Sequence, residues 1–123
     1  MSYTDLLGIK FKAHGRNKQE GFDCYGLAIE VLKRNGIALQ DIYYDSLKQN
    51  EEWWESLNSH FTKIKHPEIN CLVEISSLSQ NRGHLAVYIG EGLIIHTTVK
   101  TGVCIESITR YEHRIEGYYS VND

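Results

Sequence analysis

Apolar residues follow a helical spacing in the first half of the chain and a strand spacing in the second. Residues 23–35 carry apolar side chains three and four positions apart, which predicts an amphipathic helix. Asp23 suits the N-cap of this helix, and Gly36 suits the position just past its end. The stripe expected to face the core consists of Leu27, Ala28, Val31 and Leu32. Cys24 lies in the first turn, on the same side as that stripe.

The other segments of the first half are less periodic. Residues 2–7 predict a short helix, and the polar, glycine-punctuated residues 8–21 predict a loop. Residues 37–49 are expected to be irregular. Residues 50–61 predict a second helix capped by Asn50, because acidic residues fill its first turn.

The second half alternates apolar and polar residues, as half-buried strands do. The predicted strands cover residues 69–75, 84–89, 93–98, 102–108 and 117–121. Gly90-Glu91-Gly92 separates two of them and indicates a hairpin. Helices followed by strands are typical of the α+β class. We therefore expect N-terminal helices, one of them starting at Cys24, packed on an antiparallel β-sheet.

The register of the hairpin decides whether two histidines meet. With a three-residue turn, Ile89 lies opposite Leu93 and the aliphatic side chains share one face. The other face then carries His84, Ala86, Ile94 and His96. In this register His84 and His96 are diagonal neighbours, within reach of each other. A two-residue turn would move His96 to the aliphatic face, so burial of the apolar set favours the three-residue turn.

Cys24, His84 and His96 are the candidate catalytic residues. The helix that begins at Cys24 is the element expected against the histidine face, because the small Ala86 leaves room there. A helix N-terminus stabilises a thiolate, the nucleophilic form of cysteine. His84 then acts as general base, and His96 orients it through its second ring nitrogen. The alternative for each residue alone is structural: a small buried thiol and two hydrogen-bonded strand histidines.

The composition limits what the chain can do. A chain of 123 residues, 41% hydrophobic and 24% charged, is expected to form a single domain over residues 1–123. Its net charge of -3 argues against nucleic acid as a partner. No apolar run approaches the roughly 20 residues that cross a bilayer, so we expect no membrane insertion. The N-terminus lacks the pattern of a secretion signal, so we expect cytoplasmic synthesis.

The cysteines argue against a metal or disulfide scaffold. The three cysteines are widely spaced and form no C-x-x-C pair. Cys24, His84 and His96 are of types that bind zinc, but the sequence offers no fourth ligand. We therefore expect no metal and no cofactor.

Three motifs together resemble those of the NlpC/P60 cysteine peptidases, which cleave bacterial cell-wall peptides. Residues 21–26 read G-F-D-C-Y-G, close to the G-x-D-C-S-G signature of the family. Residues 83–90 read GHLAVYIG, and residues 93–96 read LIIH; both are similar to the strands that carry the family's histidines. The resemblance covers residues 8–121. It implies a papain-like fold, a Cys24-His84-His96 triad and cleavage of a peptidoglycan stem peptide between D-glutamate and the diamino acid.

The resemblance narrows to the phage-tail branch of the family. The features that carry it are His14-Gly15-Arg16, Tyr25 after the cysteine, residues 36–39 and residues 114–119. It implies a virion- or tail-associated enzyme that acts at the cell wall, with other tail proteins as partners. The virion would then supply the export route that the sequence lacks.

The resemblance also implies which residues face the substrate. Asp23 corresponds to a position thought to face the free amine of the stem peptide. Phe11 stands where the family usually has a tyrosine, His14 replaces a nearby glycine, and Tyr25 replaces the common serine. We expect all four to line the substrate site.

Two other functions stay open. Phe11 favours a structural tail-tip or assembly protein of reduced or no activity, which would dock through Tyr43, Tyr44 and the Trp53-Trp54 helix. Because a triad does not select the leaving group, an amidase or acyltransferase of the same superfamily is the second alternative.

Overall fold

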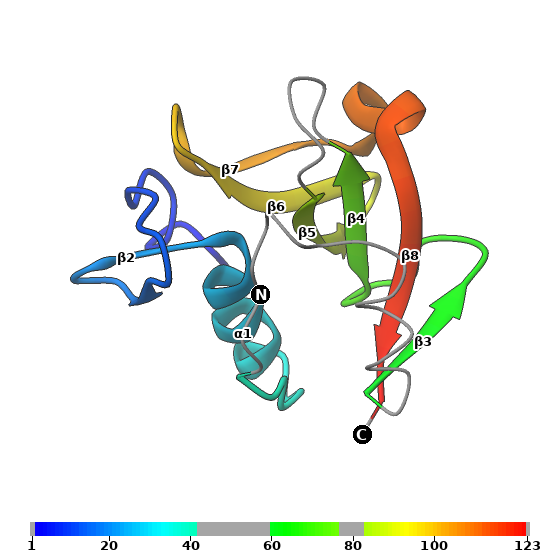
Figure 1. Cartoon of the computed structure of the whole chain (residues 1–123), viewed down its shortest axis with the longest axis horizontal. Coiled ribbons are helices and arrows are strands. Elements are labelled where there is room, and N and C mark those ends of the chain that lie inside the picture. Colours follow the sequence, from blue (N-terminus) through cyan, green and yellow to red (C-terminus); the bar gives the residue numbers. More distant parts are fainter. Residues whose placement is uncertain (1, 42–59, 77–82, 123) are drawn as a thin grey trace.

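The structure is a computed structural model that describes residues 2–41, 60–76 and 83–122. Within these residues, one α-helix lies beside a six-stranded antiparallel sheet (Figure 1). The strands, in spatial order, are β3 (Phe61–Ile64), β8 (Ile115–Val121), β4 (Leu72–Ser76), β5 (Gly83–Gly90), β6 (Leu93–Thr98) and β7 (Gly102–Ser107). The predicted α+β class is confirmed. The helix predicted from Asn50 and the proposed aromatic docking surface lie outside the described residues.

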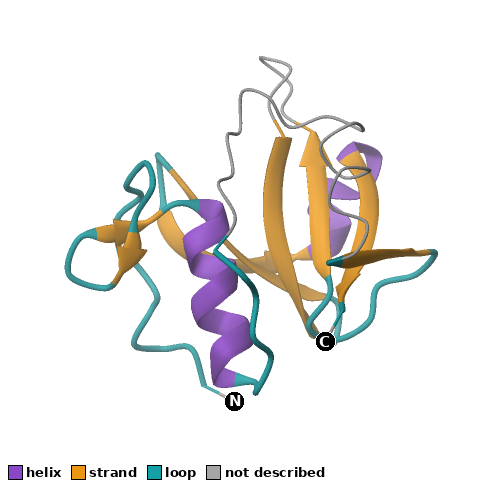
Figure 2. Cartoon of the chain, turned by 60° about the horizontal axis from the view of Figure 1, so that its bottom comes forward, coloured by secondary structure: helices purple, strands orange, loops and turns teal. Residues whose placement is uncertain are grey.

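Helix α1 (Cys24–Arg34) forms as the sequence predicts. Asp23 is its N-cap, with extended backbone and a side chain that accepts a hydrogen bond from the Gly26 N–H. Asn35 caps the other end, and Gly36 follows with a φ of +80°. This left-handed conformation favours glycine and stops the helix. Figure 2 shows the helix flanking the sheet, so its apolar stripe has one face to pack against.

The two faces of the sheet carry different clusters. On one face, the α1 stripe packs against side chains that include Leu85, Val87 and Ile95. On the other, Ala86 and Ile94 pack with residues of the 3₁₀-helix η1 (Ile108–Arg114). The prediction that α1 covers the Ala86 face is therefore wrong. The aliphatic face offers the apolar stripe more hydrocarbon to bury than a face that carries two imidazoles.

The β5–β6 hairpin keeps the predicted register but not the predicted turn. Val87 lies opposite Ile95, as expected, whereas Gly90 pairs with Leu93 and the register shifts after Tyr88. The turn therefore has two residues, Glu91 and Gly92, both with positive φ. Such turns match the twist of a hairpin. The bulge absorbs the extra residue, so the histidines and the aliphatic residues stay on separate faces.

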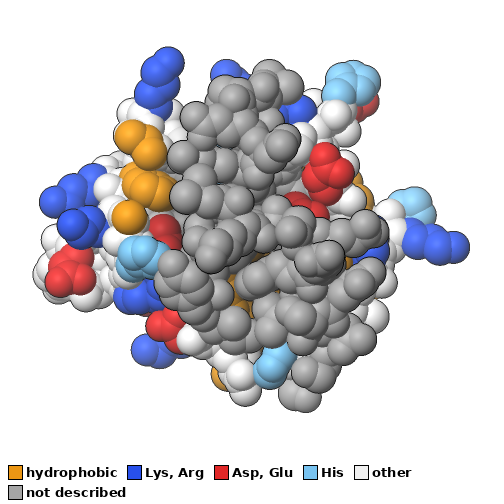
Figure 3. All heavy atoms as spheres, viewed as in Figure 1, with side chains coloured by type: hydrophobic (Ala, Val, Ile, Leu, Met, Phe, Trp, Pro, Cys, Tyr) orange, Lys and Arg blue, Asp and Glu red, His pale blue; other side chains and the backbone are white. Residues whose placement is uncertain are grey.

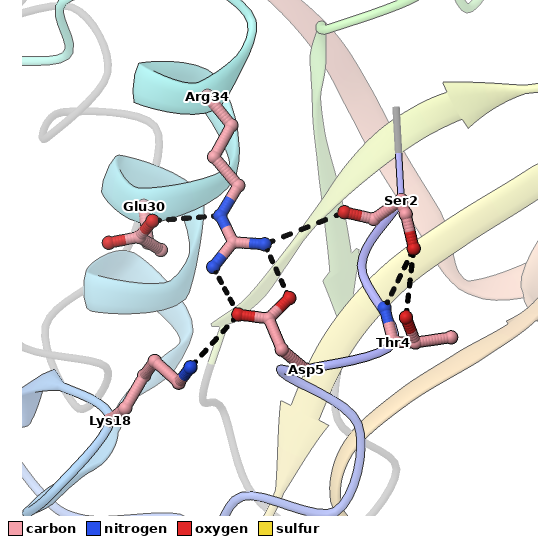
Figure 4. Close-up of polar contacts among 6 residues, drawn as sticks. All are labelled: Ser2, Thr4, Asp5, Lys18, Glu30 and Arg34. Carbon is pink, nitrogen blue, oxygen red and sulfur yellow. Dashed lines mark hydrogen bonds and ion pairs between the residues drawn. The ribbon is translucent and has the colours of Figure 1, made fainter.

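The predicted helix at residues 2–7 is wrong, because this segment forms turns. Leu6 N–H donates to the Tyr3 carbonyl, a three-residue step, and Gly8 has a φ of +83°. A six-residue segment makes too few bonds to offset helix nucleation. Figure 4 shows what holds it: the Asp5 carboxylate accepts from Arg34 of α1 at 2.6 and 2.7 Å and from Lys18 at 3.0 Å.

Other boundaries move by a few residues. The predicted loop 8–21 contains β1 (Arg16–Asn17) and the first residue of β2 (Gly21–Phe22), which pair in an antiparallel ladder. The strand predicted at residues 69–75 begins only at Leu72, because Ile69 is exposed and Asn70 has a φ of +73°. Phe61, expected at a helix end, opens β3.

Two further features of the described residues are the distribution of surface charge and the helix length. On the face shown in Figure 3, charged side chains of both signs are spread around the rim. In the part of the chain that the structure describes, no helix has the length and apolarity to span a bilayer.

Candidate active site

The start of α1 is held by a charged cap. Asp23 Oδ1 accepts from the Gly26 N–H at 2.6 Å and from Arg16 Nη1 at 2.7 Å. The same guanidinium donates to the Gly15 carbonyl at 2.9 Å and, through Nε, to Asp41 Oδ1 at 3.0 Å. Asp23 is only 7% exposed, so the pair lies largely out of water. The predicted N-cap role of Asp23 is confirmed, and Arg16 fixes this carboxylate relative to the loop before the helix.

Gly26 is where the loop and the helix touch. A Cβ at this position would lie 2.0 Å from the Gly15 carbonyl oxygen, a distance that no side chain tolerates. At Gly21, with a φ of +112°, a Cβ would lie 2.5 Å from the Lys10 carbonyl oxygen. Both glycines of the G-F-D-C-Y-G motif are thus required by backbone approach. Because neither glycine has a side chain, the loop can approach the start of α1 closely, and Cys24 lies at this junction.

The two histidines meet on the hairpin face that also carries Ala86 and Ile94. His84 Nε2 and His96 Nδ1 are 2.7 Å apart, a hydrogen bond, and the rings pack edge to face with centroids 5.0 Å apart. The prediction that the hairpin brings His84 and His96 together is confirmed. His96 is 1% exposed, and the ring of Tyr111 from η1 packs on it at 5.4 Å.

A carboxylate lies behind His96. His96 Nε2 is 3.5 Å from Glu106 Oε2 of β7 and has no hydrogen-bond partner among the described residues. The same Glu106 oxygen accepts the Tyr111 hydroxyl at 2.5 Å, and Arg110 Nε lies 3.8 Å from it. Burial alone raises the pKa of Glu106, but the Tyr111 hydrogen bond and the charges of His96 and Arg110 outweigh it. The net pKa is lowered, so Glu106 is an anion at neutral pH.

Both imidazoles are neutral at neutral pH. Burial lowers the pKa of His84, and repulsion from His96 and Arg114 lowers it further, against a smaller opposing effect of Glu106. Burial also lowers the pKa of His96, although attraction to Glu106 partly compensates. A neutral imidazole offers one lone pair and one N–H, so His84 has the form that a general base needs.

Comparison with known families decides the membership of the chain. The NlpC/P60 family profile matches residues 8–116. The chain belongs to the NlpC/P60 family. The motifs around Cys24, His84 and His96 all lie within the matched range. A comparison with curated proteins finds no match.

Solved NlpC/P60 structures share the fold. A family protein from Bacillus cereus ATCC 10987 matches with a TM-score of 0.66 and 23% identity, over 92% of this chain and 35% of that one. A protein of the family from Staphylococcus aureus, described as similar to lipoprotein, gives 0.65 and 18%, over 96% and 38%. The NlpC/p60 domain of the peptidoglycan hydrolase SagA gives 0.63 and 18%, over 95% and 91%. The chain therefore spans little more than a third of the first two proteins.

Phe11, His14 and Tyr25, three of the residues predicted to contact the substrate, have surroundings that differ from one another. Phe11 forms an isolated parallel bridge with Phe22 and is half-buried. His14 is exposed, in a turn where its φ is +61°. Tyr25 is 0% exposed, and its hydroxyl donates to the Gln40 carbonyl at 2.6 Å. The structure thus places Tyr25 in the core rather than at a binding surface.

The three cysteines have distinct environments. Cys24 is 7% exposed, at the first position of α1. Cys71 is buried in the other cluster, and burial raises its pKa to about 11, so it stays an inert thiol at neutral pH. Cys104 is half-buried opposite His96 in the β6–β7 ladder, and burial also raises its pKa. Cys104 therefore lies beside the histidine pair.

One group of side chains could accommodate a metal ion. The ligand atoms of His96, Cys104 and Glu106 lie within 4.8 Å of one another. In the structure Cys104 Sγ donates to Glu106 Oε1 at 3.6 Å, and His96 Nε2 lies 3.5 Å from Glu106 Oε2. This group differs from the zinc ligands considered from the sequence, which were Cys24, His84 and His96.

Sequence reasoning missed three residues of the site. Glu106 shares the strand parity of Cys104, so alternation along β7 was the signal that could have placed it near His96. Tyr111 lies in η1, which hydrophobic periodicity does not mark. Arg16 entered only as part of the His14-Gly15-Arg16 feature, although an arginine a few residues before a capping aspartate can bind it.

Proposed function

We propose that the chain is a cysteine endopeptidase that hydrolyses peptidoglycan. Cys24 is the nucleophile, His84 the general base and acid, and His96 the group that orients His84. The hydrogen bond of 2.7 Å between His84 and His96 carries the proposal, because it leaves His84 Nδ1 as the nitrogen for proton transfer. Family membership and the position of Cys24 at the start of α1 support it.

The reaction would proceed through a thioester. The Cys24 thiol gives its proton to His84, and the sulfur attacks the carbonyl carbon of the substrate amide. The Cys24 backbone N–H stabilises the oxyanion. The C–N bond breaks as His84 returns the proton to the leaving amine. Water, deprotonated by His84, then attacks the thioester, releasing the carboxylate and restoring the thiol.

The proposed substrate is a murein stem peptide, cut between D-glutamate and the diamino acid. Asp23 is proposed to face the free amine of the peptide while capping α1, and the exposed His14 lies on the loop that precedes it. The solved peptidoglycan hydrolase domain with the same fold supports this substrate class. We further propose that the chain works as a phage or prophage tail component, with other tail proteins as partners.

Mass spectrometry of purified stem peptides tests the reaction. Diaminopimelate and lysine peptides are incubated with the protein and with Cys24→Ala. The expected result is a pair of fragments that match cleavage after D-glutamate, absent with Cys24→Ala. The same cleavage by the Ala variant would contradict the role of Cys24.

Site-resolved alkylation tests whether Cys24 and His84 act together. If they do, the pH profile of Cys24 alkylation by iodoacetamide changes in His84→Gln. His66→Gln, a change at an exposed residue, is the matched control and should leave the profile unchanged. Equal profiles in all three proteins would contradict the proposed coupling.

The two alternatives predict different products. A structural tail protein, favoured by Phe11, leaves both peptides intact. If Phe11 causes the inactivity, Phe11→Tyr restores cleavage. An amidase or acyltransferase would leave the D-glutamate bond intact but release a different fragment or add a mass to an acceptor amine.

A further inference from the structure

A chain of polar contacts extends past the proposed triad to a fourth residue. From His84, it passes through His96 to Glu106 on the neighbouring strand β7. The contacts are 2.7 Å between the two rings and 3.5 Å between His96 Nε2 and Glu106 Oε2. Tyr111 donates to that same oxygen at 2.5 Å and packs its ring on His96.

The charge of Glu106 determines which nitrogen of His96 carries the proton. A neutral imidazole has one N–H and one lone pair, and an ionised carboxylate can only accept. If the lone pair of His96 Nε2 faced Glu106, two electron-rich groups would oppose each other at a histidine that is only 1% exposed. The arrangement with the N–H on Nε2 is therefore favoured.

The tautomer of His96 fixes that of His84. With its proton on Nε2, His96 presents the lone pair of Nδ1 to His84. His84 must then donate through Nε2–H across the 2.7 Å contact, which leaves the lone pair of its Nδ1 available. In the opposite arrangement, His96 Nδ1–H donates to His84 Nε2, and the proton on His84 Nδ1 prevents that nitrogen from acting as a base.

We infer that Glu106 is a positioning residue that selects the base-competent tautomer of His84 through His96. This inference rests on the proposed function for its catalytic consequence, but the tautomer itself is a property of the folded chain. Tyr111 holds the carboxylate in place, because its hydroxyl binds the oxygen that faces His96.

Nitrogen NMR of the histidine rings tests the inference directly. In ¹⁵N-histidine protein, His96→Gln and His84→Gln identify the ring signals of each residue. We expect His96 and His84 to be protonated on Nε2 in the wild type. In Glu106→Gln, whose amide can face His96 as donor or acceptor, both rings should show a mixture of tautomers. In Glu106→Asp, which keeps the charge, the wild-type tautomers should predominate.

Catalysis supplies the second measurement. Loss of the hydrogen-bond partner behind a metal-bound histidine costs about 10- to 100-fold in metal affinity or activity, and we take this range as a guide for His96. We expect a loss of that size in kcat for Glu106→Gln, with KM little changed, and partial recovery in Glu106→Asp. Glu112→Gln, an exposed residue of η1, is the matched control and should resemble the wild type.

The outcomes separate this inference from the proposed function. Nδ1 protonation of His96 in the wild type, or unchanged tautomers in Glu106→Gln, overturns the inference even if stem peptides are cleaved. Nε2 protonation that is lost in Glu106→Gln supports it even if no peptide is cleaved, in which case the proposed function fails alone. Circular dichroism melting curves show whether each variant is folded, and Glu106→Asp serves if Glu106→Gln is not.

Discussion

At Gly26, the absence of one methyl group allows the loop and the nucleophile helix to touch. The Gly15 carbonyl oxygen lies 2.0 Å from where a Cβ would be, so Gly26→Ala must push the loop away from α1. The added strain should lower the free energy of unfolding by at least about 2 kcal/mol. Chemical denaturation followed by circular dichroism measures this change.

Gly36→Ala is the matched control for that substitution. Gly36, unlike Gly26, has a positive φ, but a Cβ there would meet no atom within 4 Å. Only the backbone preference is lost, which costs about 1 kcal/mol. If Gly26→Ala is no more destabilising than Gly36→Ala, the close approach to Gly15 does not constrain the site.

At the scale of the element, α1 depends on Asp23 in two separable ways. Its carboxylate caps the helix through Gly26 and pairs with Arg16. Asp23→Asn keeps a capping oxygen but loses the charge, so we expect a loss of about 1 kcal/mol in unfolding free energy. Asp23→Ala loses both and should cost about 2 kcal/mol. Urea denaturation of both variants measures the difference, and equal losses would show that the capping oxygen adds nothing beyond the charge.

The same elements show how far sequence reasoning reaches. Asp23, the apolar stripe and Gly36 predict α1 because capping and periodicity are local properties. The histidine register was also predictable, since burial of the aliphatic face requires it. The sheet face that α1 covers was not predictable, because it depends on the difference between two burial energies that involve distant segments of the chain. Glu106 and Tyr111 were missed for the same reason: their importance comes from the neighbours that the β6–β7 ladder and η1 bring together.

At the scale of the whole molecule, the sheet separates two environments. The face that α1 covers is aliphatic, whereas the other face carries the His84–His96 pair, with His96 buried against Tyr111 of η1. Burial that keeps these rings neutral has a thermodynamic consequence. Lowered histidine pKa values mean that the unfolded chain binds protons at a pH where the folded chain does not.

Stability should therefore decline in mild acid. The histidine contribution is fully present above pH 6.5, the ordinary pKa, and is lost as the pH falls toward the lowered folded values. Each histidine contributes a slope of at most about 1.4 kcal/mol per pH unit. The Glu106 pKa is also lowered, but its contribution is lost only below its ordinary value of 4.5. Between pH 6.5 and 4.5, the change in unfolding free energy therefore comes from the histidines. Denaturation curves at several pH values in this range measure the slope.

Variants assign that slope to the buried pair. His84→Gln and His96→Gln each remove one group that the unfolded chain can protonate, so each should flatten the decline of the unfolding free energy. The remaining histidine also loses its imidazole neighbour, which shifts its own pKa, so the two reductions need not add. His66→Gln changes an exposed histidine and should keep the wild-type slope. If all four proteins lose stability in parallel, the acid sensitivity arises from other groups. The inference that both histidines are neutral, on which the base role of His84 depends, is then wrong.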